Sequence, residues 1–212
     1  MIKGIVFDCD GVIVDSEPYF ARGIADQLAV YGIPFDEEIF EKATGGTASL
    51  MCEMLLNKYP EINQSLEDFT KDFYVYTDRY LMSDELEPMP GLAEFVKENH
   101  EKDIKLIVAS SSPRYYVEHK LKLFKIMEYF DDIVCGDDIS HTKPHPEIYL
   151  KAIEKMGYKA EEIIAIEDST NGIKSAQSAG LYCVGFKYSE IVQDTHEADE
   201  EVKYFKDIKI LK

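Results

Sequence analysis

Two aspartates stand directly after an apolar stretch near the N-terminus. Asp8 and Asp10 follow apolar residues 5–7, and apolar residues resume at Val12. A carboxylate is ionised at neutral pH, so one of the pair can attack phosphorus and form an acyl phosphate. The other can protonate the leaving oxygen and later take a proton from water. The pair therefore indicates phosphoryl transfer, although most Asp-x-Asp pairs are turn or capping residues.

Polar residues also follow three later apolar runs, and they complete the same chemistry. Ser110, with backbone amides at a helix start, can hold phosphoryl oxygens. Lys143 supplies a local positive charge. Asp168 and Asp8 offer the oxygen ligands that Mg²⁺ prefers, with Glu167 nearby. These residues predict a magnesium-dependent phosphoryl-transfer site.

Each of these segments also has a purely structural interpretation. Ser110 to Ser112 precede Pro113, as in an N-cap with proline at the first helical position. Lys143 could be a solvated loop lysine, and Glu167 to Ser169 could begin a helix, whose dipole favours acids. Taken together, the structural interpretations would require four coincidences. We therefore favour one shared site.

Five short apolar runs predict the strands that would position these residues. They cover residues 2–7, 104–109, 133–135, 163–166 and 182–186. Helical patterns of apolar residues separate the last four runs, so the runs predict a doubly wound α/β fold with a parallel sheet covered on both faces. Ligands bind beyond the carboxyl ends of such strands. The polar segments are therefore expected at one edge of the sheet.

A helical segment interrupts this pattern after the first strand. Residues 16–87 contain helical patterns and no convincing strand, which predicts an inserted helical cap domain beside a core of residues 1–15 and 88–212. The clearest pattern is a stripe of aromatic residues that we expect to be buried core: Phe69, Phe73, Tyr76 and Tyr80. The stretch from Thr44 to Ser49 is either a turn with the cap of the next helix or a loop that selects the leaving group.

The charge of the chain limits its partners. The 212 residues include 41 acidic and 23 basic side chains, for a formal net charge of −18. Such a charge repels nucleic acid and anionic membranes. Much of this acidity is expected on solvated helix faces and in an acidic tail at residues 194–201. The expected partner is a small phosphate ester, without nucleic acid or membrane, and the protein is expected to be a monomer.

Cysteines and apolar runs indicate the compartment. The four cysteines are scattered without a CxxC pair, which predicts reduced, buried thiols and no zinc site of that type. Cys9 is disfavoured as a nucleophile because neighbouring carboxylates suppress its thiolate. No run approaches the roughly 20 apolar residues that span a bilayer, and Asp8 and Asp10 interrupt any leader-like stretch. We expect a cytoplasmic protein.

The motifs together resemble those of a known family. Asp8-Cys9-Asp10-Gly11-Val12, Ser110, Lys143-Pro144 and Glu167-Asp168 resemble the four ordered motifs of the haloacid dehalogenase superfamily, from residue 1 to about Phe186. The helical insert matches the cap position of the superfamily's first cap class. The nearest likeness is to the β-phosphoglucomutase-like branch, and it rests on three segments: Val14-Asp15-Ser16-Glu17-Pro18, Lys143-Pro144-His145-Pro146 and Ile166-Glu167-Asp168-Ser169-Thr170-Asn171-Gly172-Ile173.

This resemblance implies roles for individual residues. It implies Asp8 as nucleophile and Asp10 as acid and base. It implies Mg²⁺ held by Asp8, the Asp10 backbone carbonyl and Asp168, with Glu167 assisting. The candidates for contact with phosphate or substrate are Gly11, Ser110, Ser111, Lys143, Thr44, Gly45 and Arg114. A surface role for Arg114 is at least equally compatible with the sequence.

Departures from the family pattern separate the possible reactions. Dehalogenases of the superfamily lack the second aspartate, so Asp10 favours phosphoryl transfer, and no cap lysine equivalent to that of the phosphonate hydrolases is found. β-Phosphoglucomutases carry a histidine and an arginine where this chain has Phe20 and Ala48. We therefore expect a phosphatase acting on a small phosphate monoester, with a sugar phosphate as first choice. The alternatives are β-phosphoglucomutase and a non-catalytic regulator, the latter disfavoured by the intact motif set.

Overall fold

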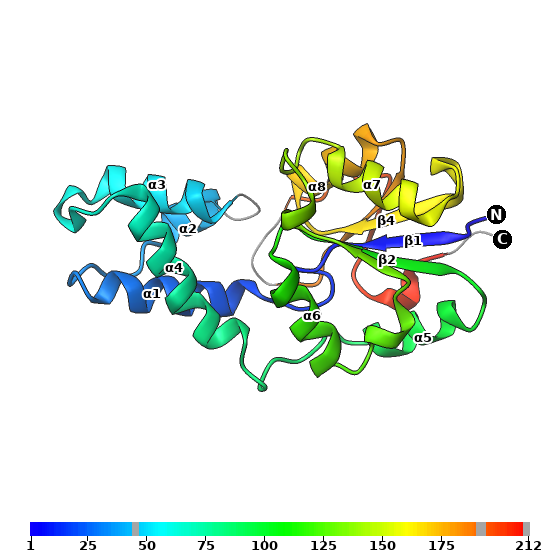
Figure 1. The fold of residues 1–212 in the computed structure, drawn as a ribbon, viewed down its shortest axis with the longest axis horizontal. Coiled ribbons are helices and arrows are strands. Elements are labelled where there is room, and N and C mark those ends of the chain that lie inside the picture. The colour runs from blue at the N-terminus through cyan, green and yellow to red at the C-terminus, as the bar shows by residue number, and fades with distance from the viewer. Residues whose placement is uncertain (44–46, 190–193, 210–212) are drawn as a thin grey trace. The chain divides into compact units, whose positions relative to one another are not determined.

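The chain forms two compact units. The computed structural model describes residues 1–43, 47–189 and 194–209. One unit comprises Met1–Asp15 and Glu87–Lys212, and the other comprises Ser16–Leu86. We call them the α/β unit and the helical unit (Figure 1). The α/β unit is therefore built from two stretches of chain that flank the helical one.

A parallel six-stranded sheet lies at the centre of the α/β unit. The strand order is β3-β2-β1-β4-β5-β6, and every neighbouring pair is parallel. The strands are β1 Gly4–Phe7, β2 Lys105–Ala109, β3 Asp132–Val134, β4 Ile163–Glu167, β5 Tyr182–Phe186 and β6 Glu200–Val202. β1 lies between β2 and β4, and Phe7 is in register with Val108 and Ile166. The residues that follow these three positions are therefore brought to the same edge of the sheet.

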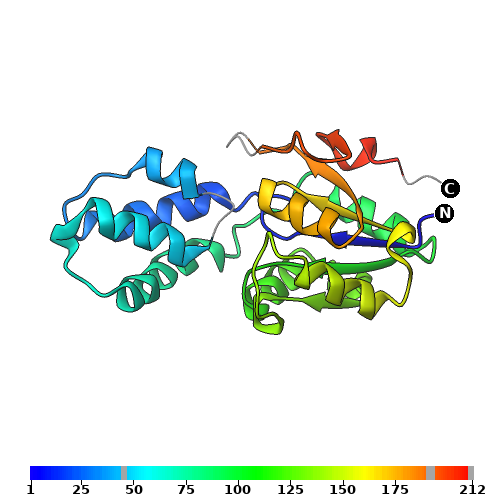
Figure 2. The ribbon, with the colours of Figure 1, turned by 90° about the horizontal axis from the view of Figure 1, so that it is seen from above.

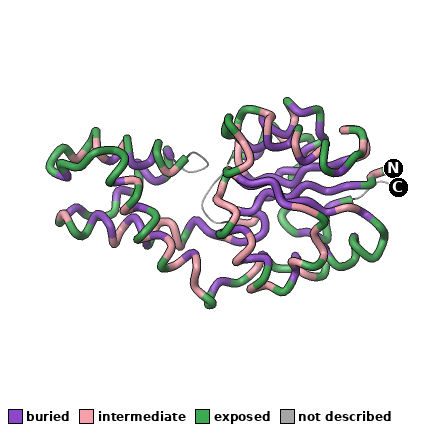
Figure 3. Tube along the Cα trace, in the orientation of Figure 1, coloured by how far each residue is buried: buried purple, intermediate pink, exposed green. Residues whose placement is uncertain are grey.

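Helices cover both faces of this sheet. Figure 1 shows α7 and α8 on one side and α5 and α6 on the other. The bounds are α5 Leu92–His100, α6 Arg114–Leu123, α7 Glu147–Met156 and α8 Thr170–Ser178. On the α5 side, the Phe7 ring meets the Phe95 ring edge to face, with centroids 6.1 Å apart. With both faces covered, every residue of β1 and β4 is buried (Figure 3), which explains why these strands are continuous apolar runs.

The doubly wound α/β prediction is confirmed, with one strand missed. The five predicted strands are present within a few residues of the expected bounds. The predicted acidic tail is partly wrong, because Glu200–Val202 forms β6 at the sheet edge (Figure 2) and Thr195 is buried. Gly185 allows this close approach, since a Cβ there would lie 2.9 Å from the Ala198 Cβ. The glutamates of β6 stay partly or fully exposed while its backbone pairs with β5.

The described residues of the helical unit contain helices and no strand. They form α1 Glu17–Ala29, α2 Glu37–Ala43, α3 Ala48–Lys58 and α4 Leu66–Leu81. α1 and α4 pack closely at Gly23, where a Cβ would lie 2.6 Å from the Thr77 Cα. The Phe20 and Phe73 rings stack across the same pair, with centroids 6.3 Å apart.

The predicted aromatic stripe of α4 is only half correct. Phe69 and Phe73 are buried, but the buried line continues through Thr77 and Leu81. Tyr76 and Tyr80 are partly exposed, and the Tyr80 hydroxyl donates to Asp26 Oδ2 at 2.7 Å. Positions four apart lie on one helix face, and α1 covers the line that includes Thr77.

All four cysteines are free and buried, as the sequence predicted. Burial raises the pKa of the Cys52 thiol to about 11 and that of Cys135 to about 12. Burial and the neighbouring Asp10 hold the pKa of Cys9 well above its usual range, so it is a poor nucleophile. Within the described ranges, none of the helices combines the length and the apolar character needed to cross a bilayer.

Candidate active site

The polar residues singled out in the sequence gather at the carboxyl ends of β1, β2 and β4. Asp8 follows β1, Ser110 follows β2, and Glu167 is the last residue of β4. The pairing continues one residue beyond the strands, because the Asp8 N–H donates to Ile166 O at 3.0 Å. Main-chain hydrogen bonds therefore fix the backbone positions of Asp8 and Ser110, independently of their side chains.

A buried ammonium joins two of the carboxylates. Lys143 Nζ lies 2.7 Å from Asp8 Oδ1 and 2.5 Å from Glu167 Oε1, and it also donates to Ala109 O at 3.2 Å. The Lys143 side chain is 9% exposed and that of Glu167 is fully buried. A buried charge needs such partners, since an unpaired one would be costly. Lys143 is therefore part of the cluster and not a solvated loop lysine.

Burial and the charge of the pairing partner act in opposite directions on the pKa values of Asp8 and Lys143. Burial raises the pKa of Asp8 to about 7, against the opposing attraction of Lys143, and repulsion from Glu167 and Asp10 adds to the rise. Burial alone would lower the pKa of Lys143, but Asp8 and Glu167 outweigh it and raise that pKa. Lys143 is thus held as a cation, and its charge favours the ionised form of Asp8.

The carboxylate of Glu167 is engaged at both oxygens. Oε1 accepts from the Tyr149 hydroxyl at 2.5 Å as well as from Lys143. Oε2 accepts from the Asp168 N–H at 3.2 Å and from Ser169 Oγ at 3.3 Å. Glu167 therefore holds Lys143 in place. Tyr149 was not predicted, because an aromatic residue on a helix facing the sheet is indistinguishable from ordinary core in the sequence.

Asp8, Glu167 and Asp168 form a buried oxygen cluster. One oxygen from each lies within 4.8 Å of the others. The turn after β1 closes against this cluster: Gly11 has φ +81°, and a Cβ there would lie 1.6 Å from Asp168 Oδ2. Only glycine combines that backbone conformation with such close approach. The backbone conformation and the close approach of Asp168 therefore explain the glycine at position 11, whether or not it contacts phosphate.

Asp10 has different partners from Asp8. Its Oδ2 accepts from Ser112 Oγ at 2.7 Å, and its Oδ1 accepts from the Tyr116 hydroxyl at 2.6 Å. Asp10 is partly exposed. Ser110 Oγ accepts the Ser112 N–H at 3.1 Å, which ties the serine loop together. Two neutral hydroxyls therefore orient the Asp10 carboxylate. Tyr116, on α6, was not predicted, for the same reason as Tyr149.

The remaining candidates are placed differently. The Arg114 guanidinium pairs with Asp138 Oδ2 at 2.6 Å and donates to Ile133 O at 3.1 Å, which gives it a structural role at the start of α6. α6 begins at Arg114, so Pro113 is its N-cap residue. The structural interpretation of the serine segment places Pro113 at the first helical position instead. Ser111 is exposed. Thr44 and Gly45 lie outside the described residues.

Known proteins resemble this chain along almost its whole length. The family model of haloacid dehalogenase-like hydrolases matches residues 5–186. A phosphorylated carbohydrates phosphatase from Thermotoga maritima is 32% identical over 180 residues, covering 85% of this chain and 82% of that protein. The fructose-1-phosphate phosphatase YqaB of Escherichia coli is 28% identical over 183 residues, covering 85% and 94%. The solved structure of CbbY from Rhodobacter sphaeroides in complex with phosphate matches with a TM-score of 0.82 and 25% identity, covering 98% and 96%.

Proposed function

The chain belongs to the haloacid dehalogenase-like hydrolase family, and we propose that it hydrolyses small sugar phosphates with Mg²⁺ through an aspartyl-phosphate at Asp8. Its similarity to named phosphatases of this family makes it a phosphoric monoester hydrolase. The observation that carries the proposal is the buried ion pair of Asp8 and Lys143, 2.7 Å apart, beside a second aspartate held by hydroxyls.

Asp8 is the proposed nucleophile. Lys143 fixes one carboxylate oxygen and favours the anionic form, which has the lone pairs needed for attack. Attack forms a bond between an Asp8 oxygen and phosphorus and breaks the ester P–O bond. Lys143 also supplies positive charge beside the phosphoryl group, which a chain of net charge −18 must provide locally.

Asp10 is the proposed acid and base. It gives its proton to the departing alkoxide, so the alcohol leaves neutral. It then takes a proton from water, whose oxygen attacks phosphorus and releases phosphate from Asp8. Ser112 and Tyr116 keep the carboxylate in place between the two steps, because each donates to a different oxygen.

The residues present fit Mg²⁺. The cluster offers only oxygen donors, as this hard cation prefers. Asp8 and Asp168 are the proposed direct ligands, whereas Glu167 is occupied by Lys143 and Tyr149. When bound, Mg²⁺ offsets the negative charge that would otherwise oppose attack of one anion on another. Gly11 serves this site by letting the backbone turn lie against Asp168.

The proposed substrate class rests on the names of the relatives and on the side chains at two positions of the helical unit, Phe20 and Ala48. Two of the relatives are named for carbohydrate phosphates. At the two positions where a mutase carries basic residues, Phe20 stacks on Phe73 and Ala48 begins α3. Neither side chain can pair with a second phosphate. This favours hydrolysis over β-phosphoglucomutase activity.

The test is phosphate release from a panel of sugar phosphates, nucleotides and phosphoacids with Mg²⁺. We expect release from one or a few sugar phosphates, loss of activity with EDTA, and recovery when Mg²⁺ is restored. Products from β-glucose 1-phosphate are analysed for glucose 6-phosphate in the same assay. Isomerised glucose phosphate with little free phosphate would replace the phosphatase proposal with the mutase. Full activity in EDTA would remove Mg²⁺ from it.

A further inference from the structure

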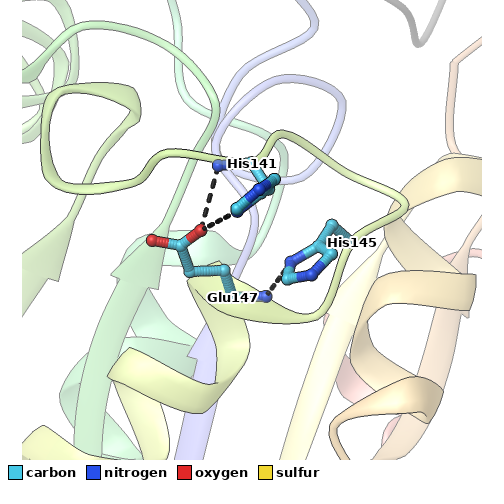
Figure 4. Close-up of side chains that lie close together, drawn as sticks. All are labelled: His141, His145 and Glu147. Carbon is cyan, nitrogen blue, oxygen red and sulfur yellow. Dashed lines mark hydrogen bonds and ion pairs between the residues drawn. The ribbon is translucent and has the colours of Figure 1, made fainter.

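A second group of metal-binding side chains lies on the loop that carries Lys143. His141 and His145 flank Lys143 at a spacing of two residues on each side, and Glu147 begins α7. Figure 4 shows these three side chains beside one another, at the loop and the start of α7. Both histidines are exposed, whereas Lys143 points inward, with its side chain 9% exposed. The same short loop therefore presents one cation to the candidate active site and two imidazoles to solvent.

We propose that His141, His145 and Glu147 bind a divalent transition metal of the Zn²⁺ class. One donor atom from each residue lies within 4.8 Å of the others. The two imidazole rings are tilted by 31°, with centroids 4.5 Å apart. Bonds of about 2.0–2.2 Å from nitrogen and oxygen to Zn²⁺ place two tetrahedral donors roughly 3.4 Å apart, which lies within that bound. Because both histidines are exposed, their side chains are able to rotate to reach that spacing.

Several contacts hold the Glu147 carboxylate in position beside the two histidines. His141 Nδ1 lies 2.9 Å from Glu147 Oε2, and His145 Nδ1 accepts the Glu147 N–H at 3.2 Å. The backbone N–H groups of Ser140 and His141 also donate to this carboxylate. Lys151 lies 3.2 Å from the other oxygen, Oε1. A metal ion that binds both His141 Nδ1 and Glu147 Oε2 would take the place of the direct contact between them.

The donor set distinguishes this site from the oxygen cluster. Imidazole nitrogen suits Zn²⁺, Ni²⁺ and Cu²⁺, whereas carboxylate oxygens alone suit Mg²⁺. Two histidines and one carboxylate leave at least one position for water. Occupation would cross-link residues 141, 145 and 147 and thereby fasten the loop around Lys143. This inference does not depend on the proposed function, because it concerns binding and loop stability.

The test is calorimetric titration of Zn²⁺ into EDTA-treated, dialysed protein held in a large excess of Mg²⁺, which occupies the oxygen cluster. We expect one Zn²⁺ per chain in the wild type and at least tenfold weaker binding in H141A and in H145A. The matched control is H196A, because His196 is another exposed histidine with its Nδ1 against a carboxylate, that of Asp194, but without the second imidazole. H196A should bind Zn²⁺ like the wild type.

A second readout guards against variants that simply fold poorly. Zn²⁺ at about ten times its dissociation constant should raise the Tm of the wild type by roughly 3–6 °C in excess Mg²⁺. The rise should disappear in the H141A/H145A double variant, whose Tm without Zn²⁺ should match that of the wild type. The proposal is overturned if Zn²⁺ does not bind in excess Mg²⁺, if both histidine variants bind it as tightly as the wild type, or if H196A weakens binding equally.

Discussion

Asp8 and Asp10 are the same residue type two positions apart, yet the protein surrounds them with different partners. Asp8 is buried against the Lys143 ammonium. Asp10 is partly exposed and is held by the neutral hydroxyls of Ser112 and Tyr116. A cation favours the anionic form of a carboxylate, whereas neutral donors orient it without adding charge. The difference fits an anion that attacks beside a group that exchanges protons.

The largest expected effect is that of Asp8→Asn. The amide cannot attack phosphorus, so kcat should fall on the order of 10⁵-fold or more. The fold should persist, because burial already disfavours the charge on Asp8. Single-turnover phosphate release measures the loss, and circular dichroism checks the fold. Wild-type-like turnover in a folded variant would remove Asp8 as the nucleophile.

Asp10→Asn should cost less, about 10²- to 10⁴-fold in kcat. The nucleophile remains, but the alkoxide leaves without a proton and the acyl phosphate is hydrolysed slowly. The Mg²⁺ concentration at half-maximal activity should be unchanged, because the Asp10 side chain is not a proposed direct ligand. A collapse of Mg²⁺ affinity would instead make Asp10 a metal-site residue and erase the contrast with Asp8.

Lys143→Met should reduce kcat by about 10²- to 10³-fold and destabilise the fold by about 3–5 kcal/mol near neutral pH. The variant leaves the buried carboxylates of Asp8 and Glu167 without their cation. Because burial raises the pKa of Asp8, its protonated form is favoured in the folded state, and the deficit should shrink as pH falls through that raised pKa.

Urea unfolding at about pH 8 and about pH 5.5 measures this deficit for Lys143→Met. Lys155→Met is the matched control, because Lys155 also pairs with a carboxylate, that of Asp132, but at the surface. The control should lose no more than about 1 kcal/mol at either pH. A deficit for Lys143→Met that grows toward acid pH would contradict the assignment of Lys143 as the counter-ion of Asp8.

The smallest expected effect is that of Tyr116→Phe, about two- to tenfold in kcat with little change in KM, since one hydrogen bond of roughly 1 kcal/mol is lost. Ser112→Ala is the matched variant for the other oxygen of Asp10. Steady-state kinetics of both variants measure how much each hydroxyl contributes to kcat through Asp10, and thermal unfolding checks that the fold is intact. A fall in stability without a fall in kcat would make Tyr116 a packing residue only.

Much of the fold was predictable because its signals are local. Strands buried on both faces are continuous apolar runs, and the helical spacing between them identified the alternation of strand and helix. β6 was missed because it is short, acidic and at the sheet edge, and its pairing depends on backbone contact with β5. Tyr76 and Tyr80 were misplaced because the helix covering α4, and not the aromatic spacing, decides which face is buried.

The sequence by itself determined the fold class and the kind of chemistry, because carboxylates and a lysine at strand ends carry that information in their type and order. Only the tertiary structure decided which groups touch. Lys143 and Asp8 are 135 residues apart in the chain, and Tyr116 and Asp10 are 106 apart. In the sequence, Tyr116 and Tyr149 are indistinguishable from ordinary core residues. Their hydroxyls reach the carboxylates of Asp10 and Glu167 only when helix and sheet have packed together.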